Sequence, residues 1–556
     1  MSATSGTPAG VDLPETRRAV LEIRNLTVSL PKGADRAFAI EDVSFTVDAG
    51  EIVCVVGESG SGKSVTAFTV MGLNDPNALK PVQGEILLDG ENLFAKSRAE
   101  LRRLRGEKMA MIFQEPMTAL NPVMKVGDQI LEMLEIHTSL SAREQKIRVL
   151  KAMQDVNLPD HEKLYHSYPH QLSGGQRQRI MIAMALALDP GLLIADEPTT
   201  ALDVTTQAQI LKLIKEIQRD HGMGVLFITH DFGVVAEIAD RVVVMQRGRI
   251  VEQGSCDDII TKPKHPYTQM LIGSVPSMIP GHRAQIDEGA PALSARGLNK
   301  VYGGGGMLGG RREVHAAKDV DLVVHGRETL GVVGESGSGK STVARCIVRL
   351  IDPTSGEVMV SGENIATLKE SALRSHRRDI QIVFQDPYRS LNPRRTVGQS
   401  IKEGPMNFGL SLADAESRAK NLMKVVGLSP DALERFPHQF SGGQRQRICI
   451  ARALAMQPKV LIADEAVSAL DVSVQAQVLD LLDDVRNRFD LAMLFITHDL
   501  RVAAQICDRI MVMQNGQVVE QGRTAEVYAK PQHPYTRSLL AAAPGRDVTF
   551  FSGQSA

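Results

Sequence analysis

Short apolar runs, separated by longer stretches with helical spacing, dominate the pattern of hydrophobic and polar positions along this chain. The runs "GEIVCVV" and "ETLGVV" end at glycine-rich segments, "LLIAD" and "VLIAD" end at an acid, and "GVLFITH" and "AMLFITH" end at a histidine. Such runs between helical segments indicate an α/β fold with a mainly parallel sheet covered by helices. Because ligands of these sheets bind at the carboxyl ends of the strands, we expect the chemistry at those ends.

The same landmarks occur twice, in one order. "FQEP" pairs with "FQDP", while "SGGQRQR" and "HPYT" recur unchanged, and from Ser173 and Ser441 onward the spacing stays at 268 residues (441 − 173). A period of this size indicates a duplicated domain rather than a solenoid. We predict a disordered tail at 1–18, a first domain at 19–275, a Pro/Gly-rich linker at 276–293, a second domain at 294–544 and a polar tail at 545–556. The glycine run Gly303–Arg312 is predicted to be a loose connection between two early strands.

Composition excludes several classes of protein. A formal net charge of -2 gives no global argument for binding nucleic acid. The five cysteines are scattered without CxxC spacing, which favours reduced thiols over a zinc site or a disulfide framework. The N-terminal segment has no apolar core of a secretory signal, and no apolar run reaches the ~18 residues that span a bilayer. The most apolar stretch, Ile180–Leu188, is interpreted as a buried helix face.

The ten letters "VVGESGSGKS" stand at both Val55–Ser64 and Val332–Ser341 and fit the phosphate-loop pattern G-x-x-x-x-G-K-[ST]. Glycines permit a tight loop whose N–H groups converge on an anion, and the following helix adds its positive end. The lysine is expected to reach the β- and γ-phosphates and the last serine to supply an oxygen to Mg²⁺. The predicted ATP-binding residues of the loops are Gly57, Ser59, Gly60, Ser61, Gly62, Lys63 and Ser64, with Gly334, Ser336, Gly337, Ser338, Gly339, Lys340 and Ser341.

Acids and histidines at the other strand ends complete the expected chemistry. An aspartate there can hold Mg²⁺, directly or through water, which applies to Asp196 and Asp464. The next residue, Glu197 or Glu465, can polarise the attacking water. The terminal histidines, His230 and His498, are expected to contact the γ-phosphate.

A second anion cradle appears in "LSGGQRQR" and "FSGGQRQR", where Ser-Gly-Gly precedes an apolar helix. With this conjunction of motifs the chain resembles the ATP-binding cassette (ABC) ATPases over nearly all of residues 20–544. The resemblance implies two tandem P-loop NTPase domains, each with a parallel core, an antiparallel β subdomain and a helical subdomain. It also implies that the cassettes pair head to tail with ATP and Mg²⁺ between them. One site would combine Lys63, Ser64, Gln114, Asp196, Glu197 and His230 with Ser441, Gly442 and Gly443; the other would combine Lys340, Ser341, Gln385, Asp464, Glu465 and His498 with Ser173, Gly174 and Gly175.

The resemblance assigns roles to further residues. Gln114 and Gln385 resemble the glutamines that touch the metal and sense the membrane partner, and Asp203 and Asp471 resemble the D-loop acids. The family usually stacks adenine on an aromatic near the domain start, where Tyr302 fits but the matching residue of the first domain is Leu30. We therefore expect weaker ATP binding at the first site, unless Phe38 substitutes.

The segments after Gln114 and Gln385, together with "HPYT", are similar to the ATPases of bacterial peptide importers for dipeptides, oligopeptides or glutathione. This implies two separate transmembrane permeases, a periplasmic or extracellular solute-binding protein and a peripheral place at the cytoplasmic face of the cell membrane. Neither "HPYTQMLIGSVPSMIPGHR" nor "HPYTRSLLAAAPGRD" contains a cysteine, so an iron–sulfur cluster is not expected. Import of another solute, such as a nickel complex, stays open. A soluble tandem-cassette translation factor is disfavoured, because the linker is short and nearly uncharged and the chain is not basic.

Overall fold

The computed structural model describes residues 18–75, 77–200, 202–281, 283, 289–303, 313–468, 470–546, 548 and 550–551. The predicted tail 1–18 lies outside the described residues except for its last position. The same holds for the glycine run after Gly303 and for parts of the predicted linker and C-terminal tail. By spatial proximity the chain divides into one unit within 1–200, 212–229 and 238–259 and a second unit within 201–211, 230–237 and 260–556. This grouping follows contact in space, so the domain boundaries drawn from the repeat stay a prediction.

The first unit holds two sheets within its described residues. A four-stranded antiparallel sheet has the order β2-β1-β4-β5, and a six-stranded sheet has the order β10-β9-β3-β8-β7-β6. In the larger sheet neighbouring strands run parallel except for the edge pair of β9 and β10. The strands are β1 (Ala19–Ser29), β2 (Phe38–Asp48), β3 (Ile52–Val56), β4 (Lys80–Leu88), β5 (Glu91–Asn92), β6 (Met109–Ile112), β7 (Leu192–Asp196), β8 (Gly224–Ile228), β9 (Arg241–Gln246) and β10 (Arg249–Ser255).

The second unit repeats this pair of sheets. Its described strands form a four-stranded sheet of order β12-β11-β14-β15 and a six-stranded sheet of order β16-β17-β18-β13-β19-β20. Again the larger sheet is parallel except at the β19–β20 edge. The strands are β11 (Leu293–Tyr302), β12 (Val314–Val324), β13 (Thr329–Val333), β14 (Ser355–Val360), β15 (Glu363–Asn364), β16 (Ile380–Val383), β17 (Val460–Asp464), β18 (Ala492–Ile496), β19 (Arg509–Gln514) and β20 (Gln517–Arg523).

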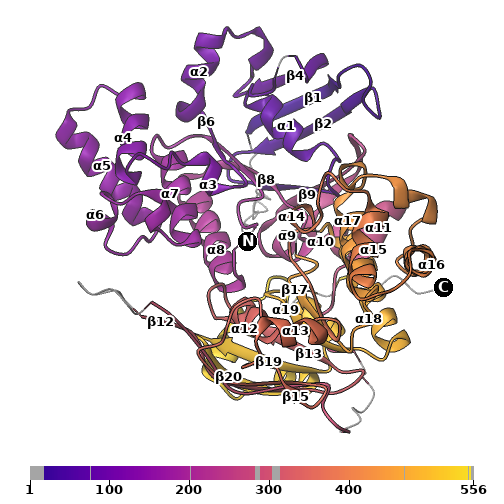
Figure 1. Ribbon diagram of the computed structural model, residues 1–556. Coiled ribbons are helices and arrows are strands. Elements are labelled where there is room, and N and C mark those ends of the chain that lie inside the picture. Colours follow the sequence, from indigo (N-terminus) through magenta and orange to yellow (C-terminus); the bar gives the residue numbers. More distant parts are fainter. Residues whose placement is uncertain are drawn as a thin grey trace, which may run out of the picture. The chain divides into compact units, whose positions relative to one another are not determined.

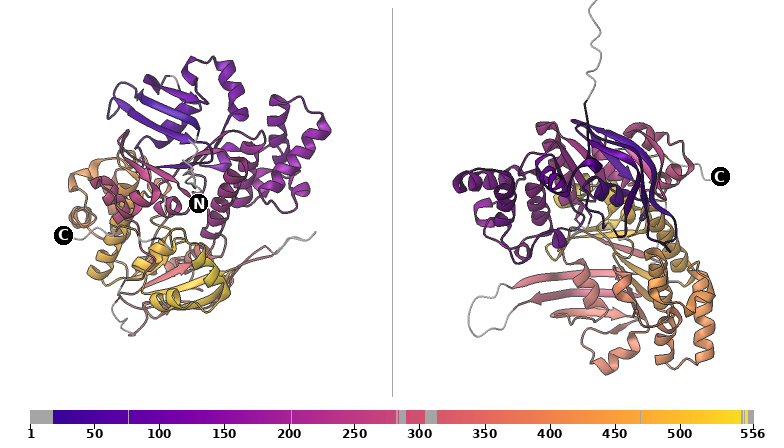
Figure 2. Two further views of the ribbon diagram at one scale, coloured as in Figure 1. Left: turned by 180° about the vertical axis from the view of Figure 1, so that it is seen from behind. Right: turned by 90° about the horizontal axis from the view of Figure 1, so that it is seen from above.

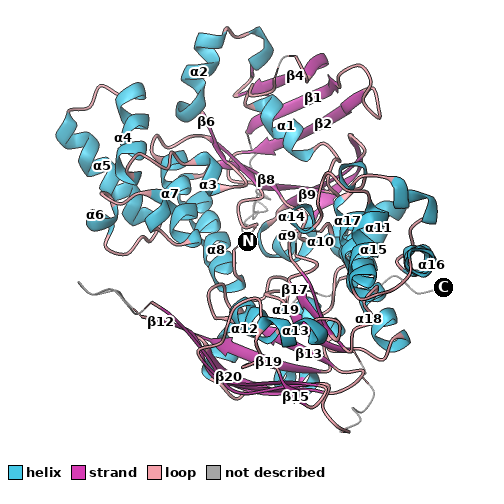
Figure 3. Cartoon of the chain, viewed as in Figure 1, coloured by secondary structure: helices cyan, strands magenta, loops and turns pink. Residues whose placement is uncertain are grey.

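Helices cover the parallel strands. α17 contacts β16, and α19 contacts β13, as Figure 3 shows for the labelled pair α19 and β13. The helices are α1 (Lys63–Val70), α2 (Arg98–Glu107), α3 (Pro116–Ala119), α4 (Val126–His137), α5 (Ala142–Asp155), α6 (His161–Leu164), α7 (Gly174–Leu186), α8 (Val204–His221), α9 (Phe232–Ile238), α10 (Cys256–Thr261), α11 (Pro266–Gly273), α12 (Lys340–Ile347), α13 (Glu370–His376), α14 (Pro387–Ser390), α15 (Val397–Asn407), α16 (Leu412–Val425), α17 (Gly442–Leu454), α18 (Val472–Arg488), α19 (Leu500–Ile506), α20 (Thr524–Ala529) and α21 (Pro534–Ala541).

The helical and antiparallel parts of the first unit stand apart from each other. Figure 1 places the sheet of β1, β2 and β4 (indigo) at one side of this unit and helices α4 to α7 (purple) at another, and the views of Figure 2 agree. The predicted antiparallel and helical subdomains are therefore present here. Among the described residues, no helix combines the length and the apolar character that crossing a bilayer would require.

Burial explains why the central strands are so apolar. Every residue of β3, β7 and β8 is buried, as is every residue of β13, β17 and β18. A parallel strand with helices on both faces has no solvated side, so both sets of alternating side chains must be apolar. The predicted mainly parallel core is confirmed. The predicted buried face at Ile180–Leu188 is largely right, since Ile180, Ile182 and Ala183 are 0% exposed.

Substitution of a glycine in the four-stranded sheet of the second unit tests how closely two strands approach each other. Gly356 in β14 has φ 101°, and a Cβ there would lie 2.3 Å from the carbonyl oxygen of Gly297. We expect Gly356→Ala to lower the free energy of unfolding by about 3 kcal/mol, because strain at positive φ and a backbone clash add together. Thermal unfolding of the full chain measures the loss.

Gly362 supplies the matched control, since its φ is 85° but an added Cβ would meet nothing within 4 Å. Gly362→Ala should therefore cost about 1 kcal/mol, from conformational strain alone. Equal losses in the two variants would contradict the close approach at Gly356.

Candidate functional site

The glycine-rich loops connect a buried strand to a helix in each unit, as the sequence predicts. Gly62 and Gly339 precede α1 and α12 with φ of 105° and 104°, a left-handed conformation that favours glycine. At the start of the first loop, a Cβ on Gly57 would lie 2.2 Å from the Met245 carbonyl oxygen. The loop thus lies against the neighbouring strand end, and its curvature requires glycine.

A buried lysine lies inside each loop. Lys63 is 6% exposed and donates from Nζ to the carbonyl oxygens of Gly57, at 2.7 Å, and Glu58, at 3.0 Å. Lys340 makes the same two kinds of contact in its own loop, at 2.7 and 2.8 Å. Burial lowers the pKa of Lys340, although nearby carboxylates partly offset the effect. Each loop therefore holds a fixed positive charge at the carboxyl end of its strand.

The expected metal-binding pair is in contact in both units. Ser64 Oγ donates to Asp196 Oδ1 at 3.1 Å, and Ser341 Oγ donates to Asp464 Oδ1 at 2.9 Å. Burial raises the pKa of Asp196 to about 6, with Glu197 adding to the rise and the serine opposing it. Burial likewise raises the pKa of Asp464. These hard oxygen donors suit Mg²⁺, which usually takes one or two protein carboxylates and completes its shell with water and phosphate.

Within the described residues, no group of three or more His, Cys, Asp or Glu side chains is arranged to hold a metal.

The glutamates after β7 and β17 adopt a strained backbone. Glu197 and Glu465 have φ of 47° and 50°, and their N–H groups donate to Ile228 O and Ile496 O at 2.9 and 3.0 Å. A non-glycine residue at positive φ costs about 1–3 kcal/mol and often marks a functional site.

Each glutamate accepts a hydrogen bond from its predicted glutamine. Gln114 Nε2 donates to Glu197 Oε2 at 2.9 Å, and Gln385 Nε2 donates to Glu465 Oε2 at the same distance. The two glutamines follow β6 and β16, so the neighbouring strands β6–β7 and β16–β17 bring these side chains together. The amide thus fixes the carboxylate that is expected to polarise water.

The histidine of the second cassette joins this cluster. His498 Nδ1 lies 3.4 Å from Glu465 Oε2. Burial lowers the pKa of His498, but the glutamate outweighs it and the net pKa is raised. Conversely, burial raises the pKa of Glu465, and His498 with Lys340 brings it below its usual range. His230 belongs to the second unit, whereas Glu197 belongs to the first.

The Ser-Gly-Gly motifs begin long helices. Ser173 caps α7 and Ser441 caps α17; each Oγ accepts from the backbone N–H of the glutamine three residues on, at 3.3 Å. The N-terminus of such a helix favours an anion through its free N–H groups and dipole. Ser173–Gly175 lie in the first unit and Ser441–Gly443 in the second. The pairing of each motif with the opposite loop therefore stays a prediction.

The two D-loop aspartates take different surroundings. Asp203 belongs to the second unit, where it accepts from Thr206 N at 2.9 Å and offsets part of the lowering that burial causes in the pKa of Lys340. Asp471 occupies the N-cap position of α18. In the second unit the structure thus places Asp203 within electrostatic reach of a phosphate-loop lysine.

Tyr302 is the last residue of β11, and Leu30 directly follows the last residue of β1. Tyr302 pairs with Val314 at the end of β11, and Leu30 N donates to Ala37 O at 2.9 Å just beyond β1. Tyr302 is 43% exposed with Lys300 Nζ 5.1 Å from its ring centroid, whereas Leu30 packs partly buried against the core. Phe38, half-buried on β2, remains the other aromatic at this end.

Two contacts to the loops were not anticipated. Arg36 Nη2 donates to Gly60 O at 2.6 Å, and Tyr535 Oη accepts from Glu335 N at 3.0 Å. Tyr535 belongs to the second "HPYT", whose histidine caps α21 by accepting from Tyr535 N at 3.2 Å. The motif is thus a turn before a helix, as expected, and it also supports the phosphate loop. The recurrence of "HPYT" was the only signal for Tyr535, and none marked Arg36.

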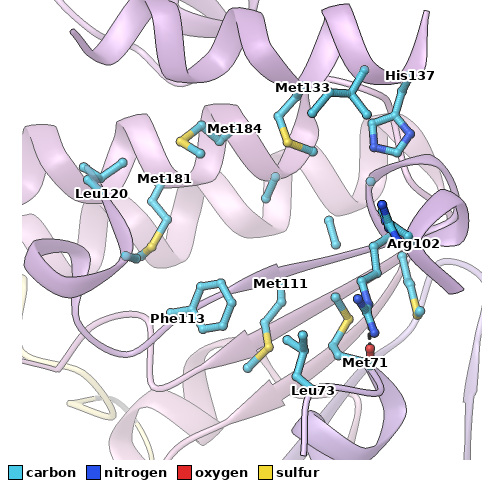
Figure 4. A pocket seen from close by; sticks show the side chains of 17 residues that line it. Met71, Leu73, Arg102, Met111, Phe113, Leu120, Met133, His137, Met181 and Met184 are labelled. Atoms are coloured by element: carbon cyan, nitrogen blue, oxygen red, sulfur yellow. Dashed lines mark hydrogen bonds between the residues drawn. The ribbon is translucent and has the colours of Figure 1, made fainter. Parts of the chain in front are cut away.

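An apolar cavity of about 380 Å³ opens in the first unit between its core and helical parts (Figure 4). Its walls come from α2, β6, α4 and α7, together with the segment after Gln114. Methionines line much of it, and the labelled side chains in Figure 4 point into a common space. Prominent lining residues are Met111, Phe113, Met133, Met181 and Met184.

Comparison with known proteins agrees with this architecture. The profile described as ABC transporter matches residues 40–200 and 317–468. The profile described as Oligopeptide/dipeptide transporter, C-terminal region, matches residues 251–302 and 519–549. Each cassette is therefore followed by a copy of the same C-terminal region.

Full-length relatives share the same organisation. The glutathione import ATP-binding protein GsiA of Salmonella typhimurium (strain LT2) is 48% identical over 562 residues, covering 95% of this chain and 90% of the relative. GsiA of Escherichia coli (strain K12) is 47% identical over 562 residues, covering 94% and 89%. A dimeric post-hydrolysis structure of an ATP-binding cassette with ADP and Pi is 29% identical, covers 42% of this chain and 98% of that chain, and has a TM-score of 0.39. The chain belongs to the ABC transporter family, as an ATPase with two cassettes.

Proposed function

We propose that this chain hydrolyses ATP to drive import of a peptide, with glutathione or a short oligopeptide as the solute. The observation that carries the proposal is that an oligopeptide/dipeptide transporter region follows both cassettes. The relatives named as glutathione import proteins support the narrower solute class. Import of another solute remains the alternative within the family, and a nickel complex is one example.

Residues of the chain would divide the chemistry of hydrolysis among them. Mg²⁺ would be held by Ser64, Gln114 and Asp196 at one site and by Ser341, Gln385 and Asp464 at the other; when bound, it neutralises charge on the phosphates. The buried lysines bind the phosphates, and Glu197 and Glu465 accept a proton from the attacking water. His230 and His498 contact the γ-phosphate. The contacts from Gln385 and His498 to Glu465 support this division of roles in the second cassette.

Each site would be completed by the other cassette. Ser441, Gly442 and Gly443 would complete the loop at Lys63, and Ser173, Gly174 and Gly175 the loop at Lys340. The capped N-termini of α7 and α17 are suited to a phosphate because they offer helix N–H groups. Binding of ATP would then favour closure of the pair, and hydrolysis would reverse it.

The apolar cavity of the first unit is suited to bind a short apolar helix of a permease. We propose that the chain works with two permeases and that a short cytoplasmic helix of one of them docks in this cavity. A solute-binding protein would act on the outer side of the membrane. The chain itself would lie at the cytoplasmic face of the membrane. Methionine side chains are flexible and adapt to the apolar face of a helix. The cavity includes Phe113, directly before Gln114, so docking would be felt at Glu197.

Separate substitutions of the two glutamates test the proposed hydrolysis. Glu197→Gln and Glu465→Gln each remove a proton acceptor, and we expect each to lower ATP turnover and solute uptake about 100-fold or more. The measurement is steady-state ATPase and uptake of labelled glutathione in vesicles that contain the permeases and the binding protein. Glu85→Gln, on the exposed part of β4, is the control.

If one variant keeps full ATPase activity and uptake, that site is not required. If ATP is hydrolysed normally but neither glutathione nor short peptides enter the vesicles, the proposed solute class is wrong.

Substitution at the rim of the cavity tests permease docking. Ile136 lines the cavity and is 63% exposed, so Ile136→Glu should preserve the fold while placing a charge on the apolar surface. We expect co-purification with the permeases and uptake to fall about tenfold or more, because an unpaired charge in an apolar interface costs several kcal/mol. ATP binding by the isolated chain should not change.

Ile147→Glu, on α5, is the matched control, because Ile147 is 60% exposed and does not line the cavity. The docking site is wrong if Ile136→Glu co-purifies with the permeases as well as Ile147→Glu does.

Substitutions of Leu30 and Tyr302 test the prediction that the two sites bind ATP with different affinities. We expect Leu30→Tyr to tighten ATP binding at the first site and Tyr302→Leu to weaken it at the second, by about 1–3 kcal/mol for stacking on an aromatic ring. Calorimetry with ATP, in the Glu197→Gln/Glu465→Gln background, measures both classes of site. Equal affinities in the parent chain would contradict the prediction.

A further inference from the structure

A buried arginine on α19 holds two aspartates that the repeat places in equivalent positions. Arg501 Nη1 and Nη2 donate to Asp231 Oδ1 and Oδ2 at 3.0 and 2.9 Å, a bidentate pair. Its Nε lies 3.5 Å from Asp499 Oδ1. The arginine side chain is only 9% exposed and that of Asp231 is 21% exposed. A planar guanidinium with several donors suits this arrangement, since it can face one carboxylate with its fork and another with Nε.

Both aspartates directly follow a predicted γ-phosphate histidine. Asp231 follows His230 and Asp499 follows His498 in the two copies of "THD". Asp499 is itself fixed, because its N–H donates to Thr497 Oγ1 at 3.0 Å and its Oδ1 accepts from Arg501 N at 2.8 Å. Arg501 thus contacts an aspartate in each of the two histidine segments.

The counterpart of Arg501 in the repeat is Gly233, 268 residues earlier (501 − 233). A Cβ on Gly233 would lie 2.2 Å from Arg501 Nη1 and 2.8 Å from Pro544 O. Gly233 N also donates to Asp231 Oδ1 at 2.8 Å, which helps to orient the carboxylate. The absence of a side chain at Gly233 therefore makes room for the arginine, and the two copies differ here in complementary ways.

We propose that Arg501 is a positioning residue that couples the two ATP sites by tying the segment after His230 to the segment after His498. A shift of either histidine segment on phosphate binding would move the shared guanidinium and so alter the other segment. The coupling needs a rigid link, and a bidentate pair with a second carboxylate on Nε is such a link. The inference rests on the proposed role of the two histidines.

The alternative is that the ion pair only stabilises the fold. Burial opposes the charge of Arg501, yet Asp231 and Asp499 hold its pKa well above the usual value. The pKa of Asp231 is lowered although burial raises it, because Arg501 and His230 lie close. Removing either charge would leave the other buried and unpaired, which destabilises a protein whatever its function. The test must therefore separate coupling from stability.

The variant Arg501→Lys separates an effect on coupling from an effect on stability. An ammonium keeps the positive charge beside Asp231 but cannot form the fork and hold Asp499 as well. We expect wild-type ATPase to be cooperative in ATP, with a Hill coefficient above 1. In Arg501→Lys we expect the Hill coefficient to approach 1 and kcat to fall about tenfold, a typical allosteric coupling, with little change in melting temperature. Both are measured on the full chain assembled with its permeases.

Arg486→Lys is the matched control. Arg486 is equally buried on α18 and pairs with Asp508 at 2.9 Å, but it contacts neither histidine segment. It should keep the wild-type Hill coefficient even if its melting temperature falls. Asp231→Asn should behave as Arg501→Lys does in the kinetics.

The proposal is overturned if wild-type ATPase is not cooperative, or if Arg501→Lys keeps the wild-type Hill coefficient. It is also overturned if Arg486→Lys loses cooperativity to the same extent. These outcomes are distinct from a failure of the proposed hydrolysis, which would appear as undiminished turnover in the separate glutamate variants.

Discussion

Burial of a lysine inside a turn of glycines is the constraint on which both sites depend. An ammonium removed from water needs oxygen acceptors, and each loop supplies them from its own backbone, as at Gly57 O and Glu58 O for Lys63. The loop can curl this tightly only because it lacks side chains where it meets Met245 O in one cassette and Met513 O in the other. In each large sheet a second parallel strand ends in an aspartate, Asp196 or Asp464, which accepts a hydrogen bond from the serine after the loop lysine.

The two glutamates after the buried strands carry backbone strain. Glu197 and Glu465 follow a fully buried strand and adopt positive φ, which no local preference of glutamate explains. The strain places the carboxylate beside a glutamine from the neighbouring strand, where it becomes both oriented and accessible. In the second cassette the histidine shares that carboxylate, and the pKa values of the two groups move apart from their usual ranges in opposite directions. The lowered pKa of Glu465 keeps this carboxylate ionised at neutral pH.

The two cassettes have the same motifs but differ in residues that lie near those motifs. Tyr302 stands exposed where Leu30 packs on the core, and Arg501 occupies the position where the first copy has glycine. Both differences lie outside the phosphate loops, so the two loops remain alike. The two copies thus share the phosphate loop and differ in the side chains around it.

The sequence by itself determined the parts that depend on local backbone and on periodic burial. The glycine loops, the apolar strands, the capped Ser-Gly-Gly helices and the turn at "HPYT" are short-range features, and the repeat revealed their order in both cassettes. The family resemblance assigned Gln114 and Gln385 to the sites, and the structure added their hydrogen bonds to Glu197 and Glu465. Only the tertiary structure decided the contacts of Tyr535 with the loop, of Arg36 with Gly60 and of Arg501 with Asp231, and it alone showed the methionine-lined cavity. These contacts join residues far apart in the chain or from different elements, and neither spacing nor propensity carries information about which long side chains will meet once the sheets are assembled.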